Sequence, residues 1–261
     1  MEQPVLISAY TFDLHPDLKK FFMHTHTTYE IYCFLSGNAK YFVEGTIYKL
    51  KPNDILIMKK AEAHSLLISK DVPYERMVIN FNSAALFGDN SENLLERIDN
   101  RPLGKNNLYS ASVLAEKRWT HYIKNICDAK DMDTKRAYLT VLLTEIYNTS
   151  NSNSRSEVYE DNFSEIITFI NQHLSDELSL DILSEKFYIS KSHLNRKFKK
   201  LTGSTVWEYI KTKRLIMAKD MLQKGIKPTL VAEKSGFNDY SAFFHAYKNK
   251  FGISPKEDMI K

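Results

Sequence analysis

The C-terminal part of the chain contains one short pattern written twice, and this repeat restricts the possible folds more than any other feature. The first copy spans 183–199 and is followed by a glycine, and the second spans 231–248 and is also followed by a glycine. The aligned residues include Leu194 with Phe243, Phe198 with Tyr247, and Gly203 with Gly252. Such a repeat indicates one structural unit used twice.

Each copy predicts a helix, a short turn and a second helix. In the first copy, Leu183 and Phe187 lie four residues apart and share one helical face. Ser190 is a suitable N-cap for the helix that follows. Leu194 and Phe198, again four residues apart, would pack this second helix onto the first.

The second copy carries the same signals, and a long helix is expected between the two. Pro228 suits the first turn of the leading helix, Gly236 allows a tight turn, and Asp239 is the expected N-cap. The connecting helix is predicted over 205–223, with Gly225 after its end. Its apolar residues cover a wide arc, so it should be buried between the two units and join them. These residues are Ile210, Met217 and Met221 on one stripe, and Leu215, Ala218 and Leu222 on the next.

A helix-turn-helix unit presents its second helix to the DNA major groove, and two joined units would reach successive grooves about 34 Å apart. The face opposite the apolar residues is polar and suits bases and phosphates. Arg196 can donate two hydrogen bonds to guanine, and Asn195 can pair with adenine. The recognition helix of the second copy is largely aromatic and should therefore discriminate between bases more weakly. The DNA-binding candidates are Ser190, Lys191, Ser192, Asn195, Arg196 and Lys199 in the first unit, and Asp239, Tyr240, Ser241, Phe244, His245 and Lys248 in the second.

Positive charge is concentrated in this same region. The chain has a net charge of +4, but from Asp161 onward Lys and Arg minus Asp and Glu give 17 − 12 = +5, which leaves 19 − 20 = −1 for the rest. Basic residues are dense between Lys186 and Lys219, where Glu208 is the only acidic residue. This distribution indicates a polyanionic partner, although a solvated helix face would show a similar run.

The N-terminal part reads as β structure with helices after it. Short segments rich in β-branched and aromatic residues predict strands over 5–12, 30–35, 40–43, 46–50, 55–58, 65–69 and 75–82. Many short strands favour a barrel or jelly roll. Helices are predicted over 112–128 and 134–149. The polar tract 148–156 has nothing to bury and is interpreted as a linker.

The C-terminal region resembles the DNA-binding domain of AraC-type transcription regulators, from about Asn162 to Met259. The resemblance rests on Tyr209-Ile210, Lys213-Arg214-Leu215, Ala218, Met221-Leu222, Ala232, Gly236-Phe237, Phe243, Tyr247-Lys248, Phe251-Gly252 and Ser254-Pro255. Departures from the family pattern are Ser184, Ser235 and His245, and the last stands where an arginine commonly reaches DNA. The resemblance therefore implies that the second helix-turn-helix unit recognises its half of the DNA site less strongly.

The β region resembles the small cupin barrel that many such regulators carry as a sensor. His24, His26, Glu30 and Gly37 stand at the spacing of the first cupin motif, and Pro52-Asn53-Asp54 with His64 falls near the second. The resemblance implies a small-molecule effector, and tyrosines in the barrel would suit a sugar or similar polyol. Ligand-binding candidates are Tyr10, His24, His26, Glu30, Tyr32, Tyr41 and His64, with Tyr29 as a further tyrosine. These polar groups could instead stabilise the barrel mouth.

In metal-dependent cupins the ligands would be His24, His26, Glu30 and His64, but regulatory cupins usually hold none, so we expect no metal and no cofactor. The alternative is a metal-dependent cupin enzyme with a helical appendage; we expect no enzyme. The C-terminal domain could also be a helical protein-interaction module.

The expected organisation is α+β: a cupin-like β-barrel with helices after it, then an all-α domain of two helix-turn-helix units joined by a long helix. Expected boundaries are 1–110 for the sensor, 111–149 for a helical dimerisation segment, 150–160 for the linker and 161–261 for the DNA-binding domain.

The partners that the resemblance implies are an operator in double-stranded DNA, RNA polymerase, usually for activation, and a second copy of the chain. Repression is equally compatible with the sequence. The stripe Ala137-Tyr138, Val141-Leu142 and Ile146 would form the homodimer, or would pack on the chain's own barrel. Only Cys33 and Cys127 are present, and no signal peptide or membrane segment is seen, so we expect a cytoplasmic protein without disulfides.

Overall fold

The computed structural model describes residues 3–69, 71–88, 91–111, 118–149 and 163–259. The chain divides into two compact units, Met1–Tyr159 and Glu160–Lys261, and each is described by itself. The predicted linker 150–160 lies outside the described residues. No helix in the described ranges is long and apolar enough to cross a membrane.

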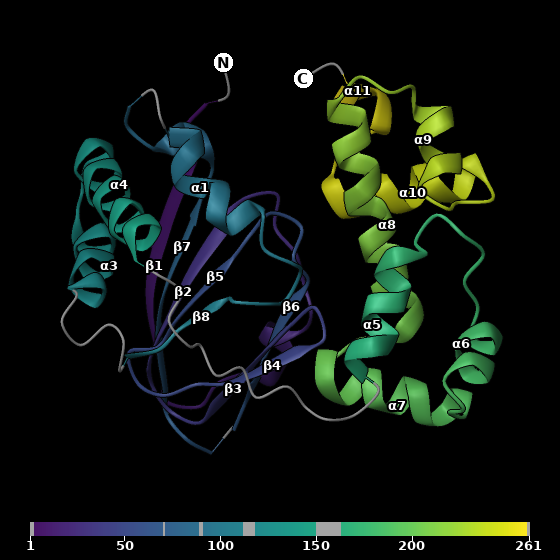
Figure 1. Ribbon diagram of the computed structural model, residues 1–261, viewed down its shortest axis with the longest axis horizontal. Helices are drawn as coiled ribbons and strands as arrows, with labels where there is room; N and C mark the ends of the chain where they lie inside the picture. The colour runs from purple at the N-terminus through teal and green to yellow at the C-terminus, as the bar shows by residue number, and fades with distance from the viewer. Residues whose placement is uncertain (1–2, 70, 89–90, 112–117, 150–162, 260–261) are drawn as a thin grey trace. The chain divides into compact units, whose positions relative to one another are not determined.

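The first unit is built on two antiparallel sheets (Figure 1). The larger has the strand order β1-β7-β2-β5-β8 and the smaller the order β4-β3-β6. The strands are β1 (Leu6–Asp13), β2 (Tyr29–Ser36), β3 (Ala39–Val43), β4 (Thr46–Lys49), β5 (Ile55–Met58), β6 (His64–Ile68), β7 (Tyr74–Phe81) and β8 (Leu108–Tyr109). The seven predicted strands are confirmed, each end within one residue. The two-residue β8 was not predicted, because its pairing with β5 has no counterpart in local sequence.

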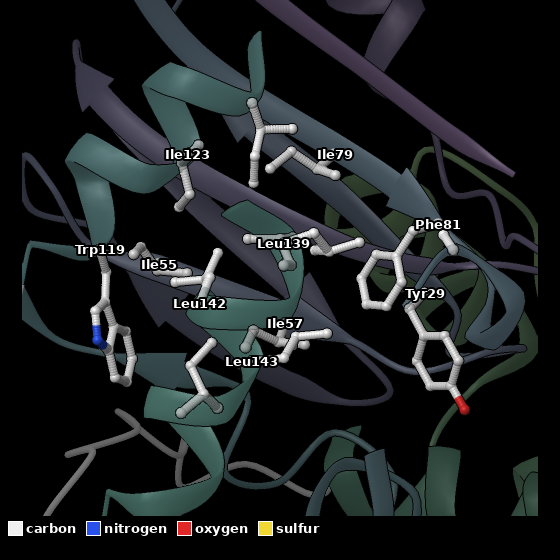
Figure 2. Close-up of a cluster of buried hydrophobic side chains, with 14 of the residues drawn as sticks. Tyr29, Ile55, Ile57, Ile79, Phe81, Trp119, Ile123, Leu139, Leu142 and Leu143 are labelled. Atoms are coloured by element: carbon white, nitrogen blue, oxygen red, sulfur yellow. The ribbon is translucent and has the colours of Figure 1, made fainter. Parts of the chain in front are cut away.

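Three helices cover the outer face of the larger sheet. They are α1 (Ser91–Asp99), α3 (Trp119–Asp128) and α4 (Met132–Asn148), and the short 3₁₀ helices η1 (Leu18–Phe21) and η2 (Ser83–Ala85) complete the unit. Figure 2 shows Trp119, Ile123 and Leu142 of the helices packed against Ile55, Ile79 and other residues of the strands. Residues 112–117 of the helix predicted over 112–128 lie outside the described ranges, and α1 was not predicted.

The side chains of the central strand β2 alternate between two cores. Tyr29, Ile31 and Cys33 point to the helices. Tyr32 and Phe34 point the other way, toward the smaller sheet. We call this second layer, which lies between the two sheets, the inter-sheet core. Because both faces of the larger sheet are covered, β2 is buried along most of its length.

The packing of α4 corrects one interpretation of the sequence. Leu142 and Ile146, expected in a dimer interface, are buried against the unit's own sheet. Tyr138 packs partly buried against the same cluster. Ala137 is exposed, and Val141 is 44 % exposed. The stripe therefore spans two faces, and its most apolar members serve the intramolecular core, because the sheet would otherwise leave its outer face uncovered.

The second unit is all helical (Figure 1). Its helices are α5 (Phe163–Gln172), α6 (Leu180–Lys186), α7 (Lys191–Thr202), α8 (Val206–Gln223), α9 (Pro228–Lys234), α10 (Tyr240–Phe251) and α11 (Pro255–Met259). Ser190 and Asp239 are the N-caps of α7 and α10, as predicted. Gly203 and Gly252 end these helices in the left-handed conformation, at φ 74° and 76°, where glycine avoids the steric cost of a Cβ. The predicted long helix is confirmed as α8, opened by a capping box between Thr205 and Glu208.

Candidate nucleic-acid interface and sensor site

Helix α7 turns one face inward and leaves the other to solvent. Leu194 and Phe198 are fully buried, and the Phe198 ring lies 4.8 Å from that of Phe163. Lys191, Ser192, Arg196 and Lys199 are exposed. An exposed helix face with Arg, Lys and Ser side chains can bind base edges and phosphates.

Three of the predicted DNA-binding residues on this helix also have partners inside the unit. Oγ of Ser190 accepts the His193 amide as the N-cap, at 3.3 Å. Lys191 forms an ion pair with Asp181 of α6. Oδ1 of Asn195 accepts the Val206 amide of α8 at 3.4 Å. Asn195 is therefore half-buried and turned toward α8, whereas Arg196 has its guanidinium at the surface.

Helix α10 has the same arrangement with different chemistry. Phe243 and Tyr247 are buried, while Tyr240, Ser241, His245 and Lys248 are exposed and Phe244 is half-buried. Asp239 uses its carboxylate to cap the helix, accepting the Ala242 amide at 2.6 Å. The exposed face is mainly aromatic and neutral, so it offers fewer donors to bases than α7 does.

Part of the basic run faces inward. Lys213 and Arg214 are buried, and Lys219 donates to the carboxylate of Asp258 at 2.9 Å. The run that indicated a polyanionic partner is thus a mixture, and its Lys191, Arg196, Lys199 and Lys200 are the exposed members on α7. The helical spacing of apolar residues along α8 could have shown which basic residues lie on its buried side and which remain exposed.

In the first unit, four predicted residues meet at one place. His24 and His26 precede β2, Glu30 lies in β2, and His64 starts β6. One potential ligand atom from each of the four lies within 4.8 Å of the others. Backbone bonds hold His24 beside His64, with each amide donating to the other's carbonyl at 3.0 Å. We call these four residues the His–Glu cluster.

The protonation of the His–Glu cluster follows from its burial. Burial lowers the pKa of His64 to about 4 and also lowers the pKa of His24, so both are neutral at neutral pH. Burial raises the pKa of the Glu30 carboxyl, but the neighbouring imidazoles, His26 first, outweigh burial and bring this pKa down to about 2. The hydroxyl of Tyr41 donates to Oε1 of Glu30 at 3.1 Å.

The inter-sheet core beside the cluster is polar and contains residues that the sequence analysis missed. The hydroxyls of Tyr32 and Tyr74 form a short hydrogen bond, and Nη1 of Arg76 donates to the Tyr74 hydroxyl at 3.4 Å. Nε of Arg76 is buried and makes no hydrogen bond within the described residues. Alternation along β7 puts Tyr74 and Arg76 on one face, which would have identified them once the inward face was known.

Two tyrosines do not belong to this core. Tyr10 is 56 % exposed on the edge strand β1 and donates to Oε1 of Glu75 at 2.6 Å. Its cross-strand partner is Met77, which points to the helices, so Tyr10 lies on the wrong face of the sheet for a ligand between the sheets. Tyr29 also faces the helices, and its hydroxyl donates to Asp99 at 2.8 Å.

Comparisons with known proteins give each of the two units a separate match. Residues 7–99 match the model of an AraC-like ligand binding domain, and residues 183–259 match a helix-turn-helix domain. The HTH-type transcriptional activator RhaS of Mannheimia succiniciproducens is 24 % identical over 245 residues, which cover 91 % of this chain and 88 % of that protein. The multiple antibiotic resistance protein MarA of Salmonella typhimurium is 34 % identical over 96 residues, which cover 36 % of this chain and 76 % of MarA.

A solved structure is similar to part of this chain. The C-terminal domain of the two-component response regulator yesN from Fusobacterium nucleatum shares 32 % identity, covers 38 % of this chain and 99 % of that one, and has a TM-score of 0.36. With MarA matched over most of its length, the chain belongs to the AraC-type transcription regulators. It combines an N-terminal ligand-binding domain with a C-terminal DNA-binding domain.

Proposed function

We propose that the chain regulates transcription by binding an operator through α7 and α10 and by responding to a small molecule held in the inter-sheet core. One observation carries the first half: α7 and α10 are two capped helices of one compact unit, each with one buried apolar face and one face exposed to solvent. The exposed residues on α7 supply base donors and phosphate contacts, and those on α10 supply mainly apolar contacts.

Selection from random duplex DNA with the full-length chain tests the DNA-binding half. We expect one enriched sequence, and an affinity that falls steeply as salt rises, because bound phosphates release counterions. Lys199→Ala should lower the slope of log affinity against log salt by about one. Lys234→Ala, an exposed lysine on α9, is the matched control and should leave that slope unchanged. No enrichment and no salt dependence would favour a protein-interaction module instead.

The effector we propose carries hydroxyl or carboxylate groups, with carbohydrates and sugar acids as the first compounds to test. Tyr32, Tyr41 and Tyr74 supply hydroxyls, and Arg76 supplies a half-buried cation whose Nε has no hydrogen-bond partner within the described residues. A compound that binds only the folded chain raises its melting temperature. Thermal-shift screening of the full chain should find such a compound, and Arg76→Met should lose the shift while the exposed Lys49→Met keeps it. A shift unchanged in Arg76→Met would place the effector elsewhere.

The remaining partners are part of the same proposal. A regulator of this class acts on the chromosome, so we infer a cytoplasmic protein that contacts RNA polymerase and activates transcription as a homodimer. The exposed face of α4, which includes Ala137 and Val141, is the part of the predicted stripe that remains for the second copy. We infer a sensing role rather than an enzymatic one for the first unit, since the family consists of transcription regulators.

A further inference from the structure

On the basis of the DNA-binding function proposed above, we propose that a cleft between α8 and α10 holds the sugar–phosphate backbone of DNA. The backbone segment is the one between the two major grooves that α7 and α10 enter, so the cleft is a third contact of the DNA-binding unit. The cleft has a volume of about 460 Å³. Its walls include Trp207 and Lys211 of α8, and Ala242, Ala246 and Asn249 of α10.

The cleft exists because only part of α8 packs on the second helix-turn-helix. Leu215 and Leu222 of α8 share a core cluster with Phe243 of α10. Lys211 and Trp207 lie about one and two turns before Leu215, where this packing has ended. Lys211 is exposed, and Trp207 is 54 % exposed. The first half of α8 therefore stands beside α10 with its side chains open to solvent.

The cleft borders the exposed face of α10. Each of its three residues on this helix directly follows a predicted DNA-binding residue, so the two sets lie about 100° apart around the helix. The pairs are Ser241 with Ala242, His245 with Ala246, and Lys248 with Asn249. Two recognition helices in successive major grooves leave the backbone between those grooves to face whatever joins them. In this unit α8 joins them.

Two lysines bring positive charge to the cleft. Lys211 and Lys250 are exposed, and neither forms an ion pair within the described residues. Partial desolvation lowers the pKa of the Lys250 ammonium, and the nearby charge of Lys211 lowers this pKa further. Two like charges repel each other, and a phosphate bound beside them would neutralise that repulsion with charge-assisted contacts. The charge of the cleft is therefore complementary to a DNA backbone.

Acidic side chains near the cleft are held by hydrogen bonds of the unit itself. The carboxylate of Asp239, which lines the cleft, caps the N-terminus of α10. Glu208 accepts the Thr205 amide at 2.7 Å. Hydrogen bonds from Thr205 lower the pKa of Glu208, and the charges of Lys211 and Lys199 lower it further. Lys199 lies on the exposed face of α7, so positive charge continues from α7 across the start of α8 to the cleft.

The remaining walls suit the sugar and the phosphate oxygens. The ring centroid of Trp207 lies 5.8 Å from Cζ of Arg214, which also lines the cleft. In the complex, Lys211 pairs with a phosphate, the Asn249 amide donates to one of its oxygens, and the Trp207 ring covers the adjoining sugar. Contacts of this kind fix the position of a protein on the duplex without reading its bases.

The test uses the full-length chain and the operator obtained by selection, over a range of salt concentrations. Lys211→Ala and Lys250→Ala should each lower affinity about three- to tenfold, with an unchanged preferred sequence. Each should also lower the slope of log affinity against log salt by about one. Lys224→Ala, at the end of α8 and about 20 Å from Lys211, is the matched control and should change neither quantity.

Methylphosphonates locate the contact on the DNA, because each replaces one charged phosphate with a neutral group. At one position between the two grooves, the replacement should weaken binding of the wild-type chain about three- to tenfold. The same replacement should weaken Lys211→Ala no further, since both changes remove one ion pair. A Lys211→Ala variant that loses as much affinity as the wild type at every position would overturn the proposal. So would salt slopes that stay unchanged in both lysine variants.

Fluorescence gives an independent readout. Trp119 is fully buried in the first unit, so Trp207 is the exposed one of the two tryptophans. Operator DNA should change the emission of the wild-type chain, and Trp207→Phe should lose most of that change. An equal change in Trp207→Phe would place the DNA away from the cleft. A wild-type chain that binds no DNA overturns the regulatory function as well, whereas normal binding by both lysine variants overturns the cleft contact alone.

Discussion

The guanidinium of Arg214 donates from Nε to the backbone carbonyl of Leu174 at 2.9 Å, and from Nη2 to that of Asp176 at 2.8 Å. These carbonyls lie between α5 and α6, ahead of the first helix-turn-helix. Gly236, in the turn of the second, lies against the same groups, since a Cβ there would meet the Leu174 oxygen at 2.5 Å and Cζ of Arg214 at 2.9 Å. Arg214 therefore connects the segment between α5 and α6 with the turn of the second helix-turn-helix.

This contact predicts that Gly236→Ala is more damaging than Gly225→Ala. Both glycines have positive φ, 81° and 79°, so both substitutions carry the cost of a left-handed backbone, about 1–2 kcal/mol. Only Gly236 lacks space for a Cβ, whereas nothing lies within 4 Å of one at Gly225. Overpacking should add about 1–3 kcal/mol. Hydrogen exchange of the α9 and α10 amides measures the difference, and equal exchange in both variants would contradict it.

A second prediction concerns asymmetric reading of DNA. Arg196→Ala should relax specificity in one half of the operator and cost about 1–3 kcal/mol, because an arginine can donate two bonds to guanine. His245→Ala should cost less and change sequence preference little. Binding selections on both variants measure this. Equal loss of specificity would show that α10 reads bases as strongly as α7.

Asn195→Ala, which loses its bond to Val206, should destabilise the start of α8 as well.

The split stripe on α4 predicts opposite results for adjacent residues. Leu142→Ala should destabilise the first unit by about 2–5 kcal/mol, because it opens a cavity against the sheet. Val141→Ala should change the free energy of unfolding by less than about 0.5 kcal/mol. Urea unfolding in a Trp207→Phe background, where Trp119 of the same core is the reporter, measures both. Val141→Asp, followed by ultracentrifugation, then asks whether the outer face of α4 forms the homodimer.

The cysteines give a prediction about pH. Burial raises the pKa of Cys33 to about 12 and the pKa of Cys127 to about 11. Because only the thiolate reacts quickly, iodoacetamide at pH 8 should modify Cys33 of the folded chain at least about a hundredfold more slowly than in urea, where the pKa returns to about 8.5. The rate should rise only as pH approaches those raised values. Mass spectrometry of the modified peptides measures the rates, and fast labelling of Cys33 at pH 8 would contradict its burial.

Local signals in the sequence predicted most of the secondary structure and the family. The caps Ser190 and Asp239, the glycines that end α7 and α10, and the four-residue spacing of Leu194 and Phe198 each act within a turn or two of chain. The strands could be predicted equally well, since the choice of residues within each strand and the turn residues between strands are local features of the sequence. Such features can be predicted because their energetics involve residues close in sequence.

Other properties depend on contacts between distant residues. Whether Tyr10 or Tyr74 faces the inter-sheet core depends on which side of the larger sheet the helices cover. The same packing decides that Leu142 is buried within the unit and does not lie on its surface. Arg214 looks like one more basic residue until Leu174, 40 positions away, accepts its hydrogen bond. His24 and His64 meet only because β2, β6 and the segment before β2 come together. Long-range packing sets these relationships, because the burial of each side chain depends on which layer of the fold covers it.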